Sequence, residues 1–165
     1  MKKSNEITAI PKTLDTLDIE GATVTIDAMG CQADITKKII NCEAVYLLAL
    51  KKNQPNLYES EGEYFKWART EPIEKKQLKE YHYEEHEHGR HIYRSVEVCN
   101  DVSWIETVRE RKRLSSVICV IRKDEREGRQ TEGTAYYISN REWEAEDVAK
   151  VIQGHWSTEN NLQQS

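Results

Sequence analysis

The fold is decided by the stretch Gly21-Ala22-Thr23-Val24-Thr25-Ile26-Asp27-Ala28-Met29-Gly30, in which an apolar, β-branched run ends at a single acid. A short run rich in Val, Thr and Ile is typical of a buried strand. In open α/β sheets, ligands bind at the carboxyl ends of the strands, which makes Asp27 a candidate for chemistry. The alternative is that Asp27 only caps the helix that follows near Gln32.

The residues after this stretch predict a helix and a second strand that is parallel to the first. Residues 32–41 carry isoleucines at helical spacing, and residues 44–50 are almost continuously apolar. Strand, helix and strand in so few residues predict a βαβ unit with parallel strands and helices on both faces. Parallel strands end at the same edge of a sheet, so we expect Asp27 and the polar residues 51–54 to share one edge.

The rest of the chain predicts antiparallel strands between two helices. Charged, histidine-rich residues after Pro72 give way to an alternating pattern, and a charged loop separates the last two strands. The expected elements are a helix at 55–68, strands at 91–98, 115–122 and 131–139, a loop at 123–130, and a helix near 143–153. We therefore predict one α/β domain with an antiparallel β-rich insertion.

Composition and charge narrow the classes of protein. The chain has 165 residues, a net charge of -5 and a pI near 5.6, which argues against general adhesion to nucleic acid but allows a local basic patch. Four cysteines without a CxxC pair predict free thiols in a reducing compartment. The sequence has no signal-peptide pattern and no run of about 18 apolar residues, so we expect a cytoplasmic protein without membrane contact.

The first candidate site is a histidine-rich run, His82-Tyr83-Glu84-Glu85-His86-Glu87-His88-Gly89-Arg90-His91. His82 and His86 have the spacing of zinc-binding helices, and a glutamate precedes the second histidine. The run lacks an apolar helical face and Gly89 interrupts it, so a solvated strand pair or loop is the simpler explanation. A small metal-binding protein that uses His82, His86 and His88 stays open as an alternative function.

The second candidate is the basic cluster Arg109-Glu110-Arg111-Lys112-Arg113, because Arg and Lys bind phosphates. Side chains distant in sequence could join it, namely Lys51, Lys52, Arg122 and Arg129. Nearby acids dilute its charge, and an ordinary solvated face is the alternative.

The third candidate is the pair of acids Asp27 and Glu159, each of which follows an element expected to be buried. Converging carboxylates can hold paired divalent metal ions about 4 Å apart, where one ion activates the attacking oxygen and the other stabilises the leaving oxygen. The spacing in sequence does not require the two acids to meet, and a helix surface position is the alternative for Glu159.

Five segments carry a resemblance that covers essentially the whole chain. In order they are Lys3-Ser4-Asn5-Glu6-Ile7-Thr8-Ala9-Ile10-Pro11, Val24-Thr25-Ile26-Asp27-Ala28-Met29-Gly30-Cys31-Gln32, Ala44-Val45-Tyr46-Leu47-Leu48-Ala49-Leu50-Lys51-Lys52-Asn53-Gln54, His88-Gly89-Arg90 and Gly154-His155-Trp156-Ser157-Thr158-Glu159-Asn160. In order and approximate spacing they resemble the DDE transposases of bacterial insertion sequences, and the H-repeat-associated group most closely.

This resemblance implies a ribonuclease-H-like catalytic domain in which three acids bind two magnesium ions and drive hydrolysis and strand transfer at transposon ends. By motif, Asp27 matches the second acid and Glu159 the last, within a signature helix at about 155–165. Residues 73–139 correspond to the β-rich insertion of such enzymes. The residues expected to contact DNA, from the resemblance and the basic cluster together, are Lys51, Lys52, Asn53, Arg90, Arg111, Lys112, Arg113 and His155.

Departures from the family pattern set further expectations. The first catalytic Asp belongs to an Asp-Gly-Lys context upstream of the segment at which this chain begins, and the relatives continue past Glu159. We therefore expect residues 1–165 to be a partial catalytic domain with an incomplete ribonuclease-H-like core, a bare apolar edge on strand 22–28, weak magnesium binding and no activity. The alternative is a non-catalytic fragment that binds DNA, or that pairs with a full-length transposase and inhibits it.

Overall fold

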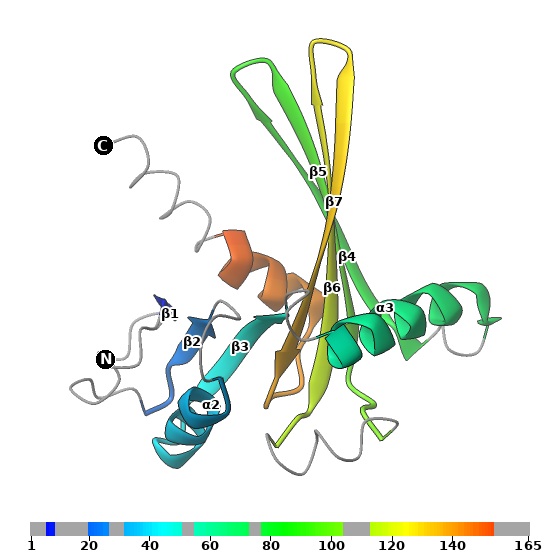
Figure 1. The fold of residues 1–165 in the computed structure, drawn as a ribbon. Helices are drawn as coiled ribbons and strands as arrows, with labels where there is room; N and C mark the ends of the chain where they lie inside the picture. Colours follow the sequence, from blue (N-terminus) through cyan, green and yellow to red (C-terminus); the bar gives the residue numbers. More distant parts are fainter. Residues whose placement is uncertain are drawn as a thin grey trace.

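The computed structural model describes residues 6–8, 20–26, 32–50, 55–72, 77–103 and 113–153 (Figure 1). Within these ranges seven strands form one mixed sheet in the order β1-β2-β3-β7-β6-β5-β4. The strands are β1 (Glu6–Thr8), β2 (Thr23–Ile26), β3 (Val45–Leu50), β4 (Lys79–Glu87), β5 (Arg90–Cys99), β6 (Ser116–Arg126) and β7 (Arg129–Ser139). The described helices are α2 (Gln32–Asn41), α3 (Pro55–Thr70) and a helical segment at 145–153. The predicted α/β class is confirmed.

β2, α2 and β3 form the predicted βαβ unit. The two strands are parallel, with Thr23 opposite Val45 and Ile26 opposite Leu48. Helix α2 ends where Glu43 adopts a left-handed conformation, with φ of 57°. The amide of Ala44 then donates to the carbonyl of Ile39 at 3.0 Å, which closes the helix and turns the chain into β3.

The outer edge of β2 is paired, so the expectation of a bare apolar edge is wrong. β1 lies parallel to β2, with Glu6 opposite Thr23 and Thr8 opposite Thr25. Three residues of β1 therefore supply a ladder for three of the four residues of β2. A strand of this length can protect an edge because hydrogen bonding, rather than side-chain burial, satisfies the exposed backbone groups.

Strands β4 to β7 form an antiparallel unit, which we call the ribbon, and its β6–β7 turn is shorter than the sequence predicts. Each hairpin turns over two residues with positive φ, His88-Gly89 (49° and 75°) and Glu127-Gly128 (51° and 77°). Positive φ at both central positions is the type I′ geometry that suits two-residue hairpins. Residues 123–130, expected to be a loop, are therefore strand except at the turn, and register places opposite charges such as Lys123 and Glu132 face to face.

The ribbon joins the parallel half of the sheet through β3 and β7. These strands pair antiparallel from Leu47 opposite Ser139 to Leu50 opposite Tyr136. Asn140, directly after β7, fixes this junction with its side chain. Its amide group donates to the carbonyl of Ala44 at 3.1 Å and accepts from the amide of Tyr46 at 2.9 Å.

Two hydrophobic cores lie on opposite faces of the sheet, which gives the described residues a three-layer arrangement. On one face α2 and α3 pack on the sheet, and Ile39 and Phe65 are fully buried there. On the other face the 145–153 helix packs through Val148 and Ile152 on Val96 and other strand residues. Helices therefore cover both faces, as predicted, while the ends of the two hairpins extend beyond them (Figure 1).

The last described helix begins two residues later than the expected Trp143. Trp143 is instead a buried anchor ahead of the helix, and its indole N–H donates to the Ser139 hydroxyl at 2.8 Å. Its backbone N–H donates to Asn100 at 3.1 Å, which ties the helix start to the end of β5. These contacts hold Trp143 ahead of the helix, which begins at residue 145.

Candidate functional site

The carboxyl ends of the parallel strands point toward the turns of the ribbon. Leu50, the last residue of β3, lies opposite Tyr136, and β7 runs from its turn toward Ser139 in the reverse direction. β2 is parallel to β3 and ends at Ile26. The residues that come next in the chain, Asp27 after β2 and Lys51, Lys52 and Asn53 after β3, lie outside the described residues.

The 145–153 helix runs in the same direction on one face of the sheet. Near its start, Glu144 accepts from Lys79 at the beginning of β4, with 3.0 Å between Nζ and Oε1. At its end, the Gln153 side chain donates to Glu85 near the end of β4, at 3.2 Å. His155 and Glu159 follow this end of the helix and also lie outside the described residues. The three elements that precede the predicted site segments thus all run toward one side of the molecule.

A row of three arginines crosses the ribbon beside its turns, on the face that carries the 145–153 helix. Register places Arg90 opposite Arg126 and Arg126 opposite Arg129, and all three line a hollow of about 480 Å³ together with Asp124, Glu127 and Thr131. We call these three residues the arginine row. Like charges directly opposite one another across strands are destabilising, so the row favours a ligand that brings negative charge.

Acids neutralise only part of this arginine row. Asp124 lies 3.3 Å from Arg90 and 2.9 Å from Arg122, so one carboxylate serves two guanidinium groups. Neither Arg126 nor Arg129 forms an ion pair with another side chain that the structure describes. Both are exposed, so their donors remain accessible to a ligand in solution. Guanidinium forks of this kind suit phosphate oxygens.

The His88-Gly89-Arg90 motif has a clear structural role. His88 and Gly89 form the turn between β4 and β5, and Arg90 is the first residue of β5. A Cβ at Gly89 would meet no atom within 4 Å, so the positive φ rather than crowding accounts for glycine here. The motif therefore builds the turn and presents Arg90 beside it.

The predicted DNA-contacting residues do not all lie together. Arg113 is exposed and precedes β6, whereas Arg90 pairs with Arg126 at the opposite end of that strand. At about 3.3 Å per residue, the length of β6 separates them by roughly 35 Å. Arg113 thus belongs to a different surface from the arginine row, and its neighbours Arg111 and Lys112 lie outside the described residues.

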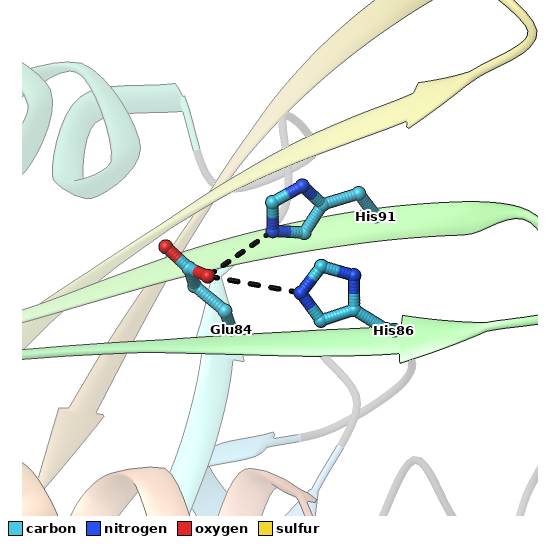
Figure 2. Close-up of side chains that lie close together, drawn as sticks. All are labelled: Glu84, His86 and His91. Carbon is cyan, nitrogen blue, oxygen red and sulfur yellow. Dashed lines mark hydrogen bonds and ion pairs between the residues drawn. The ribbon is translucent and has the colours of Figure 1, made fainter.

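The opposite face of the ribbon carries a cluster of metal-binding side chains, Glu84, His86 and His91, which we call the histidine cluster (Figure 2). It is the one group of its kind among the described residues, and it differs from the predicted set of His82, His86 and His88. The helical spacing of His82 and His86 is irrelevant here because the run is a strand. The sequence signal that could have found the cluster is the two-residue turn, which sets His86 opposite His91.

A group of buried polar side chains lies between α3 and the sheet. Glu61 is fully buried and accepts from the amide of Ile118 at 3.1 Å, and burial raises the pKa of its carboxyl well above the usual range. Arg69 forms a bidentate ion pair with buried Glu97 and also donates to the Cys119 sulfur at 3.2 Å. Burial, the largest cause, raises the pKa of the Cys119 thiol to about 12, so this cysteine is a poor nucleophile.

Comparison with known proteins places the chain among transposases. Residues 2–164 match the family model described as "Transposase DDE domain". The chain is 38% identical over 170 residues to "H repeat-associated putative transposase YhhI" of Escherichia coli K12, which covers 98% of this chain and 43% of that protein. It is 36% identical over 168 residues to "Putative transposase YncI" of Escherichia coli O157:H7, which covers 97% of this chain and 41% of that protein.

Two further comparisons set the scale of these matches. YbfL of Escherichia coli K12 is 39% identical over 170 residues, covering 98% of this chain and 43% of its own length. The chain thus spans about two fifths of the length of these relatives. A solved S-adenosylmethionine-dependent methyltransferase from Clostridium acetobutylicum covers 83% of this chain and 47% of its own, with a TM-score of 0.22 and 9% identity, which is too distant to define the fold. Among the described helices, none has the length and apolar character needed to span a membrane.

Proposed function

Because the chain belongs to the transposase DDE domain family, we propose that it contributes to the catalytic domain of a DNA transposase that cuts and joins DNA at insertion-sequence ends by metal-assisted phosphoryl transfer. The parallel β2-α2-β3 unit, with helices on both faces of the sheet, supports the further proposal of a ribonuclease-H-like core. A DNA substrate of this kind also implies a cytoplasmic location.

The proposed catalytic acids are Asp27 and Glu159. They follow β2 and the 145–153 helix, two elements that run toward the same side of the molecule. The family implies use of a divalent metal, and a carboxylate donor set fits Mg²⁺ because this ion prefers oxygen ligands. Bound ions of this kind supply charge stabilisation for the attacking and leaving oxygens of a phosphoryl transfer. The role of the two side chains would be to hold the metal in place.

The observation that carries the DNA-binding part of the proposal is the arginine row. Arg90, Arg126 and Arg129 lie on the sheet face that packs against the 145–153 helix, whose carboxyl end leads toward His155 and Glu159. We infer that DNA phosphates lie along this face, so that the ribbon positions the duplex beside the proposed catalytic edge, the side of the sheet where β2 and β3 end. Phosphate contacts set orientation and affinity without reading sequence.

Fluorescence anisotropy with a labelled duplex that carries a matching transposon end tests this interface. Binding by the full 165-residue chain should weaken as salt rises, and Arg126→Ser/Arg129→Ser should reduce the slope of log affinity against log salt by about 2, since each phosphate contact contributes about 0.9. Lys37→Ser/Lys66→Ser makes the same charge change on α2 and α3, on the other face, and should leave the slope unchanged. Equal losses in the two double variants would overturn the proposed interface.

We also propose the remaining DNA contacts that the resemblance and the basic cluster predict. Lys51, Lys52, Asn53 and His155 follow elements that run toward the proposed catalytic edge. Arg113 precedes β6 at the end far from the arginine row, so a contact there would require a second stretch of duplex, and we propose the same for its sequence neighbours Arg111 and Lys112. Serine substitutions in each set, measured in the same assay, separate a single interface from two.

We also propose that the 165 residues by themselves do not cleave DNA, because the resemblance assigns them two of three catalytic acids. The test is incubation of the purified chain with transposon-end DNA and Mg²⁺. Cleavage or joining that is lost in Asp27→Asn would show that the chain is active. A separate proposal, pairing with a full-length transposase, predicts co-purification with such a relative and inhibition of its strand transfer.

A further inference from the structure

We propose that the histidine cluster, Glu84, His86 and His91, binds one divalent transition-metal ion, with Zn²⁺ the best fit. The site lies on the ribbon face opposite the arginine row. Its ligand set of two imidazoles and one carboxylate differs from the acids expected to hold Mg²⁺, and the inference does not depend on the proposed DNA-cutting activity.

The short turn of the β4–β5 hairpin brings these ligands together. His88 and Gly89 are the two turn residues, so Glu87 and Arg90 form the first cross-strand pair and His86 and His91 the second. In a hairpin of this type, the second pair is not hydrogen-bonded, and its Cα atoms come within about 4.5 Å, the closest approach in an antiparallel sheet. Glu84 lies two residues before His86 and therefore on the same face.

The distances between donor atoms match those of a metal site. The Glu84 Oε2 atom lies 3.2 Å from Nε2 of His91 and 3.9 Å from Nε2 of His86, and all three ligand atoms lie within 4.8 Å of one another. Tetrahedral zinc with bonds of about 2.0–2.1 Å requires about 3.3 Å between ligand atoms. Figure 2 shows both imidazoles directed at the same carboxylate oxygen, so small rotations of exposed side chains would admit the ion.

The chemistry of the donors selects the class of metal. Imidazole nitrogen suits zinc, copper and nickel, whereas Mg²⁺ and Ca²⁺ favour sites made of oxygen. Three protein ligands leave at least one coordination position for water, and the exposed side chains of Glu84 (53%) and His86 (70%) leave room for it. The site is therefore open rather than a closed structural one.

The surroundings favour a cation and hold one ligand in place. Glu125 lies opposite His91 in β6 and adds negative charge beside the site, whereas further along the same face Lys123 and Glu132 lie opposite one another and offset each other's charge. The His91 ring packs between the rings of His86 and Tyr93, with 4.0 Å between centroids on each side. This stacking restricts His91, which is 25% exposed, and so lowers the ordering needed to bind an ion.

Bound metal would clamp the end of the β4–β5 hairpin, because the ligands come from both of its strands. A clamp at this position would fix the strand that presents Arg90 on the other face. A clamp has scope to act here because β4 is an edge strand of the sheet and has a single neighbour, β5.

Titration of the full chain with Zn²⁺, in competition with a chromophoric chelator, tests the site. We expect one equivalent to bind, and His86→Gln or His91→Gln to weaken binding at least tenfold. His82→Gln is the matched control, because His82 lies on the same strand and face but beside Glu80, at 3.8 Å, and should bind as the wild type does. Cys42→Ser, which removes an exposed thiol, should also leave binding unchanged.

A second measurement separates the cluster from adventitious surface binding. Saturating Zn²⁺ should slow amide hydrogen exchange near the His88-Gly89 turn, and His91→Gln should abolish this protection. Equal losses of affinity in His82→Gln and His86→Gln, binding that needs Cys42, or exchange that Zn²⁺ leaves unchanged would each overturn the proposal.

Discussion

The root and the tip of the ribbon are built from the same four strands, yet their side chains meet different surroundings. At the root, residues 95–99, 116–120 and 135–139 pack between α3 and the 145–153 helix, and Val96, Ile118 and Ile138 are fully buried. At the tip, charged and histidine side chains such as Glu84, His86, Glu125 and Arg129 are exposed. The difference teaches that backbone pairing, ion pairs and ring stacking order the tip, while apolar burial holds the root.

The largest expected effect of a single substitution is at the root. Ile138→Ala removes a fully buried side chain from the core beneath α3, and should lower the free energy of unfolding by about 2–5 kcal/mol. Thr131→Ala, seven residues earlier on the same strand but exposed at the tip, should change it by less than about 0.5 kcal/mol. Urea unfolding followed by circular dichroism measures both, and similar values for the two would erase the distinction between root and tip.

The next largest effect is expected where the root holds a charge. Arg69→Leu leaves the buried carboxylate of Glu97 without its bidentate partner, and should cost about 2–3 kcal/mol. This is below the usual cost of breaking a buried pair, because the Arg69 side chain is 31% exposed. Arg69→Leu/Glu97→Leu should recover most of the loss, and a double variant as unstable as the single one would contradict this reading.

Glu61 should make the stability of the root depend on pH. Burial raises the pKa of Glu61 well above its ordinary value in the folded protein, and the hydrogen bond from the Ile118 amide opposes this only in part. A raised pKa means that the folded state binds the proton more tightly, so this contribution is present below the unfolded-state pKa and is lost as pH rises through the folded-state pKa.

Glu61→Gln should therefore be more stable than the wild type at pH 8, by about 1 kcal/mol, and should unfold with a flatter pH dependence. Thermal unfolding between pH 4 and pH 8 measures this change. Glu63→Gln provides the control, since Glu63 is exposed on the same helix. A steeper pH dependence in Glu61→Gln than in the wild type would refute the assignment.

The smallest effect on stability is expected in the arginine row. Arg126→Ser/Arg129→Ser removes like charges that face each other across two strands, so it should leave the free energy of unfolding within about 0.5 kcal/mol of the wild type. Differential scanning calorimetry detects a change of that size. A large loss of unfolding free energy would mean that the tip arginines stabilise the fold, and would argue against their proposed role in DNA binding.

Sequence patterns predicted the parallel half of the sheet better than the ribbon. The continuous apolar run at 44–50 indicates a strand buried on both faces, and the isoleucine spacing of 32–41 indicates a helix buried on one face; β3 and α2 lie where these patterns place them. The ribbon tip has no such pattern because it buries little. Residues 79–87, 123–126 and 129–130 are strand through cross-strand pairing, which a local composition of charges and histidines does not reveal.

The candidate sites show the same limit. Arg90 was found through the His88-Gly89-Arg90 motif, and Arg129 was named only as a distant addition to the basic cluster. Their common neighbour Arg126 follows from the register of β5, β6 and β7, which only the structure supplies. His86 was found through helical spacing, for a reason that proved wrong. Its partners Glu84 and His91 follow from the turn geometry. The acids Asp27 and Glu159 came from the resemblance and stay predictions.

The junction at Asn140 also has a consequence for the order of folding. The two hairpins of the ribbon close over two-residue turns, whereas Asn140 bonds to residues that lie 94 and 96 positions earlier in the chain. Contacts so distant in sequence close a large loop and are formed slowly. We infer that the ribbon folds first and docks on β3 late, so Asn140→Ala should speed unfolding and hardly slow refolding. Stopped-flow kinetics that show the opposite partition would place the junction in the folding nucleus.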